Sequence, residues 1–380
     1  MKISGDWIAH PGTQALCDVL AQAGHQALFV GGCVRNALLD VAVADIDIAT
    51  DARPEIVSNL AETAGLRVIP TGIVHGTVTV IAQGVAHEIT TFRRDVETDG
   101  RRAVVMFATD VAEDAARRDF TMNALYARAD GSVLDPLGGL PDLIARRVRF
   151  VGDPQARIRE DYLRILRFFR FYAVYGDPSA GIDAEGLAAC AAHAEGLVGL
   201  SRERVGTEMR KLLSARDPSL AVAAMTQTGI LARVLPGSDG KALSVLVHLE
   251  DDLAPRWQRR LAVLGGADPG ADLRLSRMEK GSNMAVRDEI GSDLTPAALG
   301  WKLGLTDATD VVLCRAALFE TLPAGNWQAE ILRGVSSTIP VTAADLMPVL
   351  KGAALGKKLH EIEARWLASD LYLRKSDLLA

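Results

Sequence analysis

A glycine pair followed by two spaced aspartates constrains this chain more than any other feature of its sequence. Residues 27–30 form a short apolar run that ends at Gly31 and Gly32, and a short helical pattern follows over residues 34–39. This order predicts a strand, a tight turn and a helix. Backbone N–H groups at the start of a helix favour anions, and Arg35 adds a forked phosphate donor. The turn is therefore a candidate site for a triphosphate.

The two aspartates, Asp45 and Asp47, alternate with Ile46 and Ile48. Side chains two residues apart on a strand point to the same face, so both carboxylates face one way while the isoleucines face a core. Mg²⁺ takes oxygen ligands, commonly one or two protein carboxylates with substrate phosphates. Two metals about 4 Å apart can hold the attacking and leaving oxygens of an in-line displacement. For an isolated pair of this kind, a solvated strand face is the alternative.

A third acid follows on another predicted strand. Residues 76–81 and 87–92 are rich in β-branched side chains and alternate in polarity, which predicts two strands. Glu88 falls on the second of them. It is a candidate to help hold a metal or to deprotonate a hydroxyl. The alternative is a surface charge on an edge strand.

Charged residues also recur along a long apolar-periodic stretch. Asp161, Arg164, Arg167 and Arg170 are spaced by three within or beside residues 162–175. This spacing keeps them on one drifting stripe of a helix. Ion pairs along a surface helix are the alternative explanation.

Five motifs in order resemble those of the class II nucleotidyltransferases, the bacterial-type tRNA CCA-adding enzymes and bacterial poly(A) polymerases. The resemblance covers about residues 25–215, and the extreme C-terminus resembles the family tail more loosely. The motifs are Gly31-Gly32-x-Val34-Arg35 with Asp45-x-Asp47-x-Ala49-Thr50, then Arg117-Arg118-Asp119-Phe120-Thr121-Met122-Asn123-Ala124, Asp135-Pro136-Leu137-Gly138-Gly139-x-x-Asp142-Leu143, Glu160-Asp161-x-x-Arg164-Ile165-Leu166-Arg167, and Glu203-Arg204-Val205-x-x-Glu208-x-x-Lys211-Leu212-Leu213.

The resemblance implies that the protein itself acts as the template for the base. Asp161 would accept from the exocyclic amine of C or A, and Arg164 would donate to the adjacent ring acceptor. Only C and A offer that edge, so one site could select both CTP and ATP, and a buried polar mismatch would reject the other bases. Arg167 and Arg170 would reach phosphate or ribose.

The resemblance also implies roles around the triphosphate. Asp45 and Asp47 would bind Mg²⁺, Arg118 would bind the triphosphate, and Asp119 would meet the ribose. Taken alone, Arg117 and Arg118 are equally typical of a solvated helix start.

The chain departs from the family pattern at two positions in the first motif. The family usually has Asp where Asn36 stands and Gly where Asp40 stands. Asn36 can still cap or hydrogen-bond, but it removes a negative charge near the metals.

Two segments bear on which nucleotides are added. Residues 93–116 are polar and predict a mobile loop; in the family, relatives that add only C have this loop shortened. Its full length here favours addition of C, C and A, or of A alone. The strongest competing function is that of a poly(A) polymerase. Those relatives carry an arginine-rich strand where residues 72–77 read Gly-Ile-Val-His-Gly-Thr, and usually a basic C-terminal extension; the absence of both features here favours CCA addition. An inactive RNA-binding module is the alternative from another class.

Composition limits the partners and the compartment. The net charge of −6 restricts RNA contacts to local patches. One candidate patch is Arg256, Arg259 and Arg260 around Trp257, and a second is Lys351, Lys357, Lys358 and Arg365; ordinary helix-surface charge is the alternative for both. The four scattered cysteines favour neither zinc nor disulfides and predict a cytoplasmic protein. No segment is long and apolar enough to span a membrane.

The sequence therefore predicts an α+β protein with a small mixed-sheet nucleotidyltransferase head, followed by a helical neck, body and tail. We expect the head at residues 1–150, the neck and body at 151–265 and the tail at 266–380. The predicted activity is addition of C, C and A from CTP and ATP to the tRNA 3′ end, with release of pyrophosphate. The oligomeric state is left open.

Overall fold

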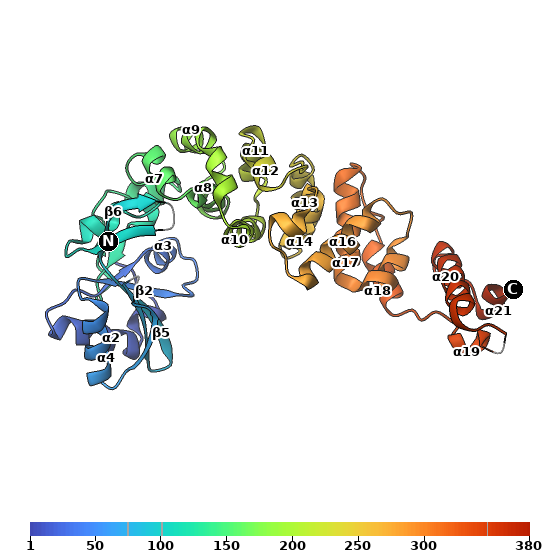
Figure 1. Cartoon of the computed structure of the whole chain (residues 1–380), viewed down its shortest axis with the longest axis horizontal. Helices are drawn as coiled ribbons and strands as arrows, with labels where there is room; N and C mark the ends of the chain where they lie inside the picture. Colours follow the sequence, from blue (N-terminus) through green and yellow to red (C-terminus); the bar gives the residue numbers. More distant parts are fainter. Residues whose placement is uncertain (74–75, 100–101, 348) are drawn as a thin grey trace. The chain divides into compact units, whose positions relative to one another are not determined.

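The computed structural model describes residues 1–73, 76–99, 102–347 and 349–380, and it forms two compact units, Met1–Leu200 and Ser201–Ala380 (Figure 1). The strands of the first unit are β1 (Leu28–Val30), β2 (Ile46–Thr50), β3 (Arg67–Gly72), β4 (Thr77–Ala82), β5 (Val85–Thr91), β6 (Arg93–Asp99), β7 (Arg102–Phe107), β8 (Tyr126–Ala127) and β9 (Val133–Leu134). Its helices are α1 (Asp6–Ala9), α2 (Pro11–Gln22), α3 (Gly32–Leu38), α4 (Pro54–Thr63), α5 (Val111–Ala116), α6 (Leu140–Ile144), α7 (Pro154–Glu160), α8 (Leu163–Tyr175) and α9 (Ala184–Ala192), with 3₁₀ turns η2 (Thr121–Asn123) and η3 (Ala194–Gly199).

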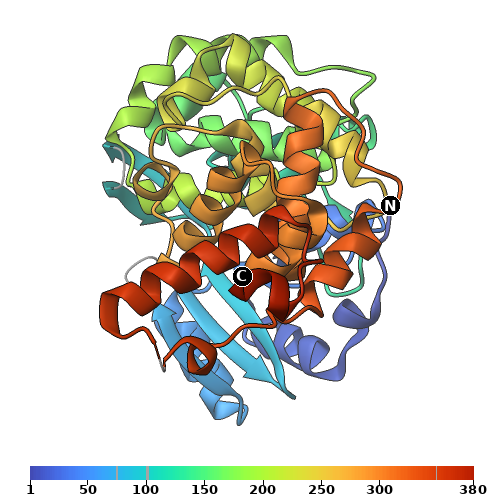
Figure 2. The same cartoon turned by 90° about the vertical axis from the view of Figure 1, so that its right-hand side faces the viewer.

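A mixed seven-stranded sheet in the order β3-β4-β5-β2-β1-β8-β9 forms the base of the first unit (Figure 2). Strands β2 and β5 run parallel, and the other neighbours run antiparallel. Helices α2 and α4 pack on β4. Gly12 allows this close approach, because a Cβ there would lie 2.4 Å from the carbonyl oxygen of Ala82. The predicted fold class, a mixed-sheet head followed by helices, is confirmed.

Strand β2 has the alternation that the sequence predicts. Ile46 and Ile48 are buried, whereas Asp47 on the same strand is half-buried. Asp45 immediately precedes the strand instead of lying within it. The partner strand β5 lies inside the sheet, between β4 and β2. The expectation of an edge strand for Glu88 is therefore wrong, although its side chain is exposed, as the surface-charge alternative expects.

Helix α8 packs against the preceding part of the first unit through a cluster of phenylalanines. Phe120, which follows Asp119, lies with its ring centroid 4.9 Å from that of Phe171 on α8 and 5.0 Å from that of Phe150. Phe150 and Phe168 stack at 5.4 Å. Aromatic rings bury large apolar areas. The cluster therefore holds the phenylalanine face of α8 against the protein and so sets the direction in which the charged residues of α8 point.

The segment predicted as a mobile loop, residues 93–116, is largely regular. Strands β6 and β7 pair antiparallel, and α5 follows with Asp110 as its N-cap. Valines and threonines in this segment favour strands, and the polar composition concealed that signal. Residues 100 and 101 of the segment, and residues 74 and 75 of the predicted 72–77 turn, lie outside the described residues.

The second unit is helical. It contains α10 (Arg202–Leu213), α11 (Ser219–Gln227), α12 (Ile230–Val234), α13 (Leu243–Glu250), α14 (Trp257–Leu264), α15 (Pro269–Asp272), α16 (Arg277–Ile290), α17 (Pro296–Leu318), α18 (Trp327–Val335), α19 (Ala343–Leu346), α20 (Gly352–Ala368) and α21 (Lys375–Leu379). Helix α17 is interrupted at Gly304, whose φ is 75°. In the described part of the chain, no helix has both the length and the apolar character needed to cross a membrane.

The compact units and the predicted domains divide the chain at different points. The first unit extends to Leu200 and so includes residues 151–200, which we expect to belong to the neck and body. The division by function into head, neck with body, and tail stays a prediction.

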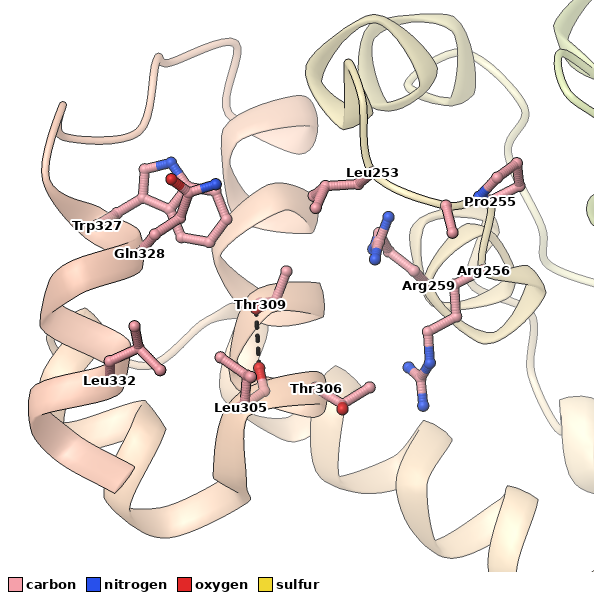
Figure 3. A pocket seen from close by; sticks show the side chains of 11 residues that line it. Leu253, Pro255, Arg256, Arg259, Leu305, Thr306, Thr309, Trp327, Gln328 and Leu332 are labelled. Atoms are coloured by element: carbon pink, nitrogen blue, oxygen red, sulfur yellow. Dashed lines mark hydrogen bonds between the residues drawn. The ribbon is translucent and has the colours of Figure 1, made fainter. Parts of the chain in front are cut away.

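The first predicted RNA patch belongs mostly to the core of the second unit. Glu250 accepts hydrogen bonds from Arg259 at 2.9 Å and from the Nη2 of Arg260 at 2.7 Å, and all three side chains are buried. Arg259 also donates to the fully buried Asp310 at 2.8 Å. Ordinary helix-surface charge does not explain Arg259 and Arg260 either, because both side chains are buried and paired with a buried acid. Arg259 borders a pocket of about 540 Å³ that also contacts Trp327 (Figure 3).

We predict that Glu250→Ala destabilises the second unit by about 3 to 5 kcal/mol, since it leaves two buried guanidinium groups without their shared carboxylate. Urea unfolding followed by circular dichroism measures the change. The matched control is Glu361→Ala, which removes a half-exposed carboxylate 3.7 Å from Lys358 and should change the free energy of unfolding by less than about 0.5 kcal/mol. Equal effects of the two substitutions would contradict the buried network.

Candidate active site

Three acids meet in one open pocket at the sheet. Asp45, Asp47 and Glu88 line a pocket of about 260 Å³, together with Thr79 and residues at the start of β5. Asp47 and Glu88 are direct partners in the parallel pairing of β2 and β5. Because paired residues of neighbouring strands share a face, the sheet itself places the third acid beside the first two. The structure therefore brings together the three residues that the sequence predicts to be catalytic.

The acids perturb one another. The pKa of Asp47 is raised to about 6, mainly by burial and then by the charges of Glu88 and Asp45, whereas Arg118 and Arg35 act in the opposite direction. A half-buried carboxylate surrounded by acids is the donor set that a hard divalent cation fits. Among the described residues, no group of three or more His, Cys, Asp or Glu side chains is arranged to hold a metal.

The glycine turn lies next to an arginine. Gly31 adopts φ 66° and ψ −114° ahead of α3, a conformation that strains other residues. A Cβ at Gly31 would stand 3.4 Å from the Nη1 atom of Arg118. Gly32 begins α3, as the sequence predicts within two residues. The turn thus lies directly against a guanidinium, and its role in binding phosphate stays a prediction.

Arg35 has contacts that the sequence did not indicate. Its guanidinium donates to Asn36 at 2.9 Å, to Asn123 at 2.5 Å and to the hydroxyl of Tyr175 at 2.7 Å. Its carbon Cζ lies 4.1 Å from the centre of the Tyr175 ring. The side chain is buried, and this burial lowers its pKa. Arg35 therefore joins α3 to α8, and its predicted role as a phosphate donor stays a prediction.

Arg118 is held by two residues that sequence reasoning missed. It donates to Asp114 at 2.9 Å and to the hydroxyl of Tyr126 at 3.0 Å. Burial alone would raise the pKa of Asp114, but Arg118 and Arg117 lower it to about 2. The signal for this cluster was present in the sequence, since an acid lies three and four residues before two arginines. Arg117 and Arg118 follow α5 instead of starting a helix, which corrects the alternative given above.

Asp119 connects the segment after α5 to α8. It is buried and accepts from Asn123 at 2.9 Å and from the Nε atom of Arg167 at 2.8 Å, with a second bond from the Nη2 of Arg167. Burial would raise the pKa of Asp119, but the Arg167 charge and these donors hold it below its ordinary value. Both N–H groups of Arg167 donate to one oxygen of Asp119, Oδ2, while Oδ1 accepts from Asn123, so each carboxylate oxygen has a partner.

The predicted base-selecting residues lie where α7 gives way to α8. Asp161 is non-helical at this junction, and its Oδ1 atom accepts from the backbone of Leu163 at 3.1 Å. Arg164 pairs with Glu160 and donates to the carbonyl oxygens of Arg157 at 2.8 Å and Arg117 at 3.3 Å. The predicted stripe therefore begins at Arg164, and Asp161 stands just ahead of the helix.

Arg170 completes the set on α8. Its Cζ atom lies 4.5 Å from the centre of the Phe171 ring, and Arg167 approaches the same ring at 5.4 Å. The acid pocket and the arginine cluster are neighbours, because Arg118 and Arg35 both act on the charge of Asp47. The structure thus assembles all the predicted site residues in the first unit, and their individual roles stay predictions.

Comparisons with known proteins agree with this arrangement. A family model described as the poly A polymerase head domain matches residues 27–149, and a model for a probable RNA and SrmB-binding site of polymerase A matches residues 181–240. The mitochondrial CCA tRNA nucleotidyltransferase 1 of Danio rerio is 31% identical over 394 residues, which cover 97% of this chain and 90% of that protein. This chain belongs to the CCA tRNA nucleotidyltransferase family. The resemblance predicted from the motifs is confirmed, and the family uses a divalent metal ion.

Other relatives match part or all of the chain. The mitochondrial CCA tRNA nucleotidyltransferase 1 of Mus musculus is 43% identical over 204 residues, and the match spans 53% of this chain and about half, 47%, of that relative. The crystal structure of the Bacillus stearothermophilus CCA-adding enzyme in complex with CTP aligns with a TM-score of 0.74 at 29% identity, covering 94% of this chain and 93% of that one. The family fold therefore extends over nearly the whole chain.

We predict that Asp47→Asn stabilises the metal-free protein at pH 8. The folded pKa of Asp47, about 6, exceeds its ordinary value of 3.8, so ionised Asp47 costs folding free energy above pH 6, and this cost disappears as the pH falls to 4. With allowance for partial exposure, the expected gain is about 1 to 2 kcal/mol at pH 8 and near zero at pH 4. Chemical unfolding in EDTA at both pH values measures it. A gain of the same size at pH 4 would contradict the electrostatic cause.

Proposed function

We propose that this protein is a tRNA nucleotidyltransferase that adds C, C and A to the tRNA 3′ end, using CTP and ATP and releasing pyrophosphate. The observation that carries the proposal is the meeting of Asp45, Asp47 and Glu88 in one pocket, with Arg118 and Arg35 near enough to act on the charge of Asp47. The full-length similarity to the zebrafish CCA tRNA nucleotidyltransferase supports it, and so does the likeness to a CCA-adding enzyme crystallised with CTP.

The acid pocket would perform the transfer. The 3′ hydroxyl of the tRNA attacks the α-phosphate of the nucleotide, the new phosphodiester bond forms, and the bond to the pyrophosphate group breaks. Bound to Asp45 and Asp47, Mg²⁺ would stabilise the negative charge that develops on the phosphate oxygens. Glu88, which pairs with Asp47 across strands β2 and β5, would take the hydroxyl proton.

Base selection is assigned to Asp161 and Arg164. In this proposal Asp161 accepts from the exocyclic amine of C or A, and Arg164 donates to the neighbouring ring acceptor. Glu160 and two backbone carbonyl groups hold Arg164 in place, so little reorganisation is needed when a base binds. G and U present the opposite polarity and would leave buried groups unpaired.

The remaining arginines would bind the rest of the nucleotide. Arg118, next to Gly31, is assigned to the triphosphate, and Asp119 to the ribose. Arg167 and Arg170 are assigned to phosphate or ribose from α8. The substrate tRNA, Mg²⁺ as the specific ion and a cytoplasmic location are parts of this proposal; the four free, buried cysteines are compatible with a reducing compartment.

Addition of A alone and synthesis of poly(A) are the second candidates, because the matching head model carries the poly A polymerase description. Extension of one labelled tRNA, supplied without CCA, with C or with CC, separates the three. Three nucleotides added to the bare end support the proposal. One A added only to the CC end identifies an A-adding enzyme, and a long ladder with ATP alone identifies a poly(A) polymerase; either result overturns C-C-A addition.

We predict that Asp45→Ala and Asp47→Ala each lower the rate of nucleotide addition by about 10²- to 10³-fold or more, because the charge developing on phosphate loses its counter-ion. Binding of tRNA, followed by fluorescence anisotropy, should be unchanged. Glu62→Ala on the exposed side of α4 is the control and should leave the rate unaltered. Full activity of either aspartate variant would refute the metal assignment.

A further inference from the structure

Tyr175, the last residue of α8, makes contacts that neither the motifs nor the proposed mechanism explain. Its hydroxyl accepts a hydrogen bond from the Nη2 of Arg35 at 2.7 Å, and its ring faces the same guanidinium at 4.1 Å. Phe171, one turn earlier on α8, lies 5.2 Å from that guanidinium. The end of α8 thus encloses the arginine that follows the glycine turn.

Asn36 extends this contact toward the acid pocket. Its Oδ1 accepts from the Nε and Nη2 atoms of Arg35 at 3.2 and 2.9 Å. Its Nδ2 donates to the carbonyl oxygen of Ala42 at 3.0 Å, in the segment that leads to Asp45. One amide therefore binds both the arginine and the backbone before the first acid, and only a side chain with a donor and an acceptor can do so.

A second chain of contacts returns to α8. The Nη1 of Arg35 donates to Asn123, whose own Nδ2 donates to Asp119 at 2.9 Å. Asp119 in turn accepts both bonds from Arg167. Arg167 and Tyr175 lie two turns apart on α8, so Arg35 is tied to that helix twice, directly through Tyr175 and indirectly through Asn123 and Asp119.

We propose that Tyr175 is a positioning residue which, through Arg35 and Asn36, holds the phosphate-binding turn and the acid pocket in register with the base-selecting helix α8. The inference rests on the proposed function and deepens it. The Tyr175 hydroxyl touches no reacting atom in this proposal; it acts by fixing where the nucleotide's phosphates lie relative to its base.

The physical reason is the burial of Arg35, of which 7% is exposed. Its side-chain acceptors from Asn36, Asn123 and Tyr175 are neutral, and loss of one leaves a buried N–H group of a cation unpaired. The guanidinium must then shift toward another acceptor, and α3 shifts with it. Displacements of about 1 Å at a reacting centre can cost 10²-fold in rate.

Tyr175→Phe tests the proposal, because it keeps the ring and removes only the hydroxyl. We expect kcat/KM for CTP and for ATP to fall about 10- to 100-fold, with a raised KM for both nucleotides and an unchanged KM for tRNA. The matched control is Tyr172→Phe on the same helix, whose hydroxyl has no part in this network. Thermal unfolding of all variants separates a loss of register from a loss of fold.

A double-mutant cycle supplies the second readout. The Asn36→Asp substitution loses the bond to the carbonyl oxygen of Ala42 but offers a charged acceptor to Arg35, so in this background removal of the Tyr175 hydroxyl should cost less than about threefold. Wild-type kinetics in Tyr175→Phe would overturn the proposal. So would a loss of activity that matches a loss of thermal stability and is not reduced in the Asn36→Asp background.

The failure of this inference is distinguishable from failure of the proposed function. If the wild-type protein extends no tRNA end, the proposed function fails, and titration calorimetry of CTP with wild type and Tyr175→Phe still decides the inference. Weaker CTP binding by the variant, again reduced in the Asn36→Asp background, supports the positioning role. Equal CTP binding by the two proteins overturns it.

Discussion

The ion pair between the buried Asp119 and the half-buried Arg167 is the interaction on which the rest of the site depends. It joins the segment after α5, which follows the sheet, to the helix that carries the predicted base-selecting arginine. Removing Arg167 leaves the buried Asp119 carboxylate without its charged partner, which costs less than the roughly 3 to 5 kcal/mol of a fully buried pair because 31% of the Arg167 side chain is exposed. The phenylalanines beside it supply the apolar contact that holds α8 at the right distance, and the ion pair sets its rotation. Arg164 can then reach the carbonyl oxygen of Arg117, at the end of α5.

The site uses its charges in two opposite ways. Asp114 and Glu160 are each matched by two arginines, and these acids serve to fix the arginines in place. Asp45, Asp47 and Glu88 instead lie together in one pocket, and the charges of Glu88 and Asp45 add to the burial that raises the pKa of Asp47. An acid cluster of this kind costs stability in the absence of a cation, as functional sites commonly do. The arginines that border it limit this cost, since Arg118 and Arg35 act against the rise in the Asp47 pKa.

Much of the site could be predicted from local pattern and family resemblance. The period of two placed Asp45 and Asp47 on one face, and the apolar run before Gly31 located the turn. The register of Asp47 with Glu88 could not be predicted, because it depends on a parallel pairing across an intervening helix and two strands. The bond between Arg35 and Tyr175 joins residues 140 positions apart, and no periodicity in either helix indicates it.

Two predictions from the sequence were wrong because the polar or charged character of a segment does not show whether it is buried or exposed. Polar composition suggested a loop at residues 93–116, although strands β6 and β7 within it pair antiparallel as a hairpin. Arg259 and Arg260 resembled a basic surface, but a helical pattern does not distinguish a solvated arginine from one paired with a distant buried acid such as Glu250. Both errors have one cause, namely that burial of a charged or polar side chain depends on partners remote in sequence.

The most direct test of the account is base selection by the protein itself. Single-turnover addition to a tRNA ending in CC is measured with ATP, GTP and UTP, for the wild-type protein and for Asp161→Ala. The account predicts that the wild type prefers ATP by at least about 10⁴-fold, and that the variant loses most of this preference while still adding nucleotides, because the buried acceptor that rejects the wrong base is gone. An unchanged preference for ATP in the variant would contradict the assignment of Asp161 and the idea that α8 and its junction serve as the template.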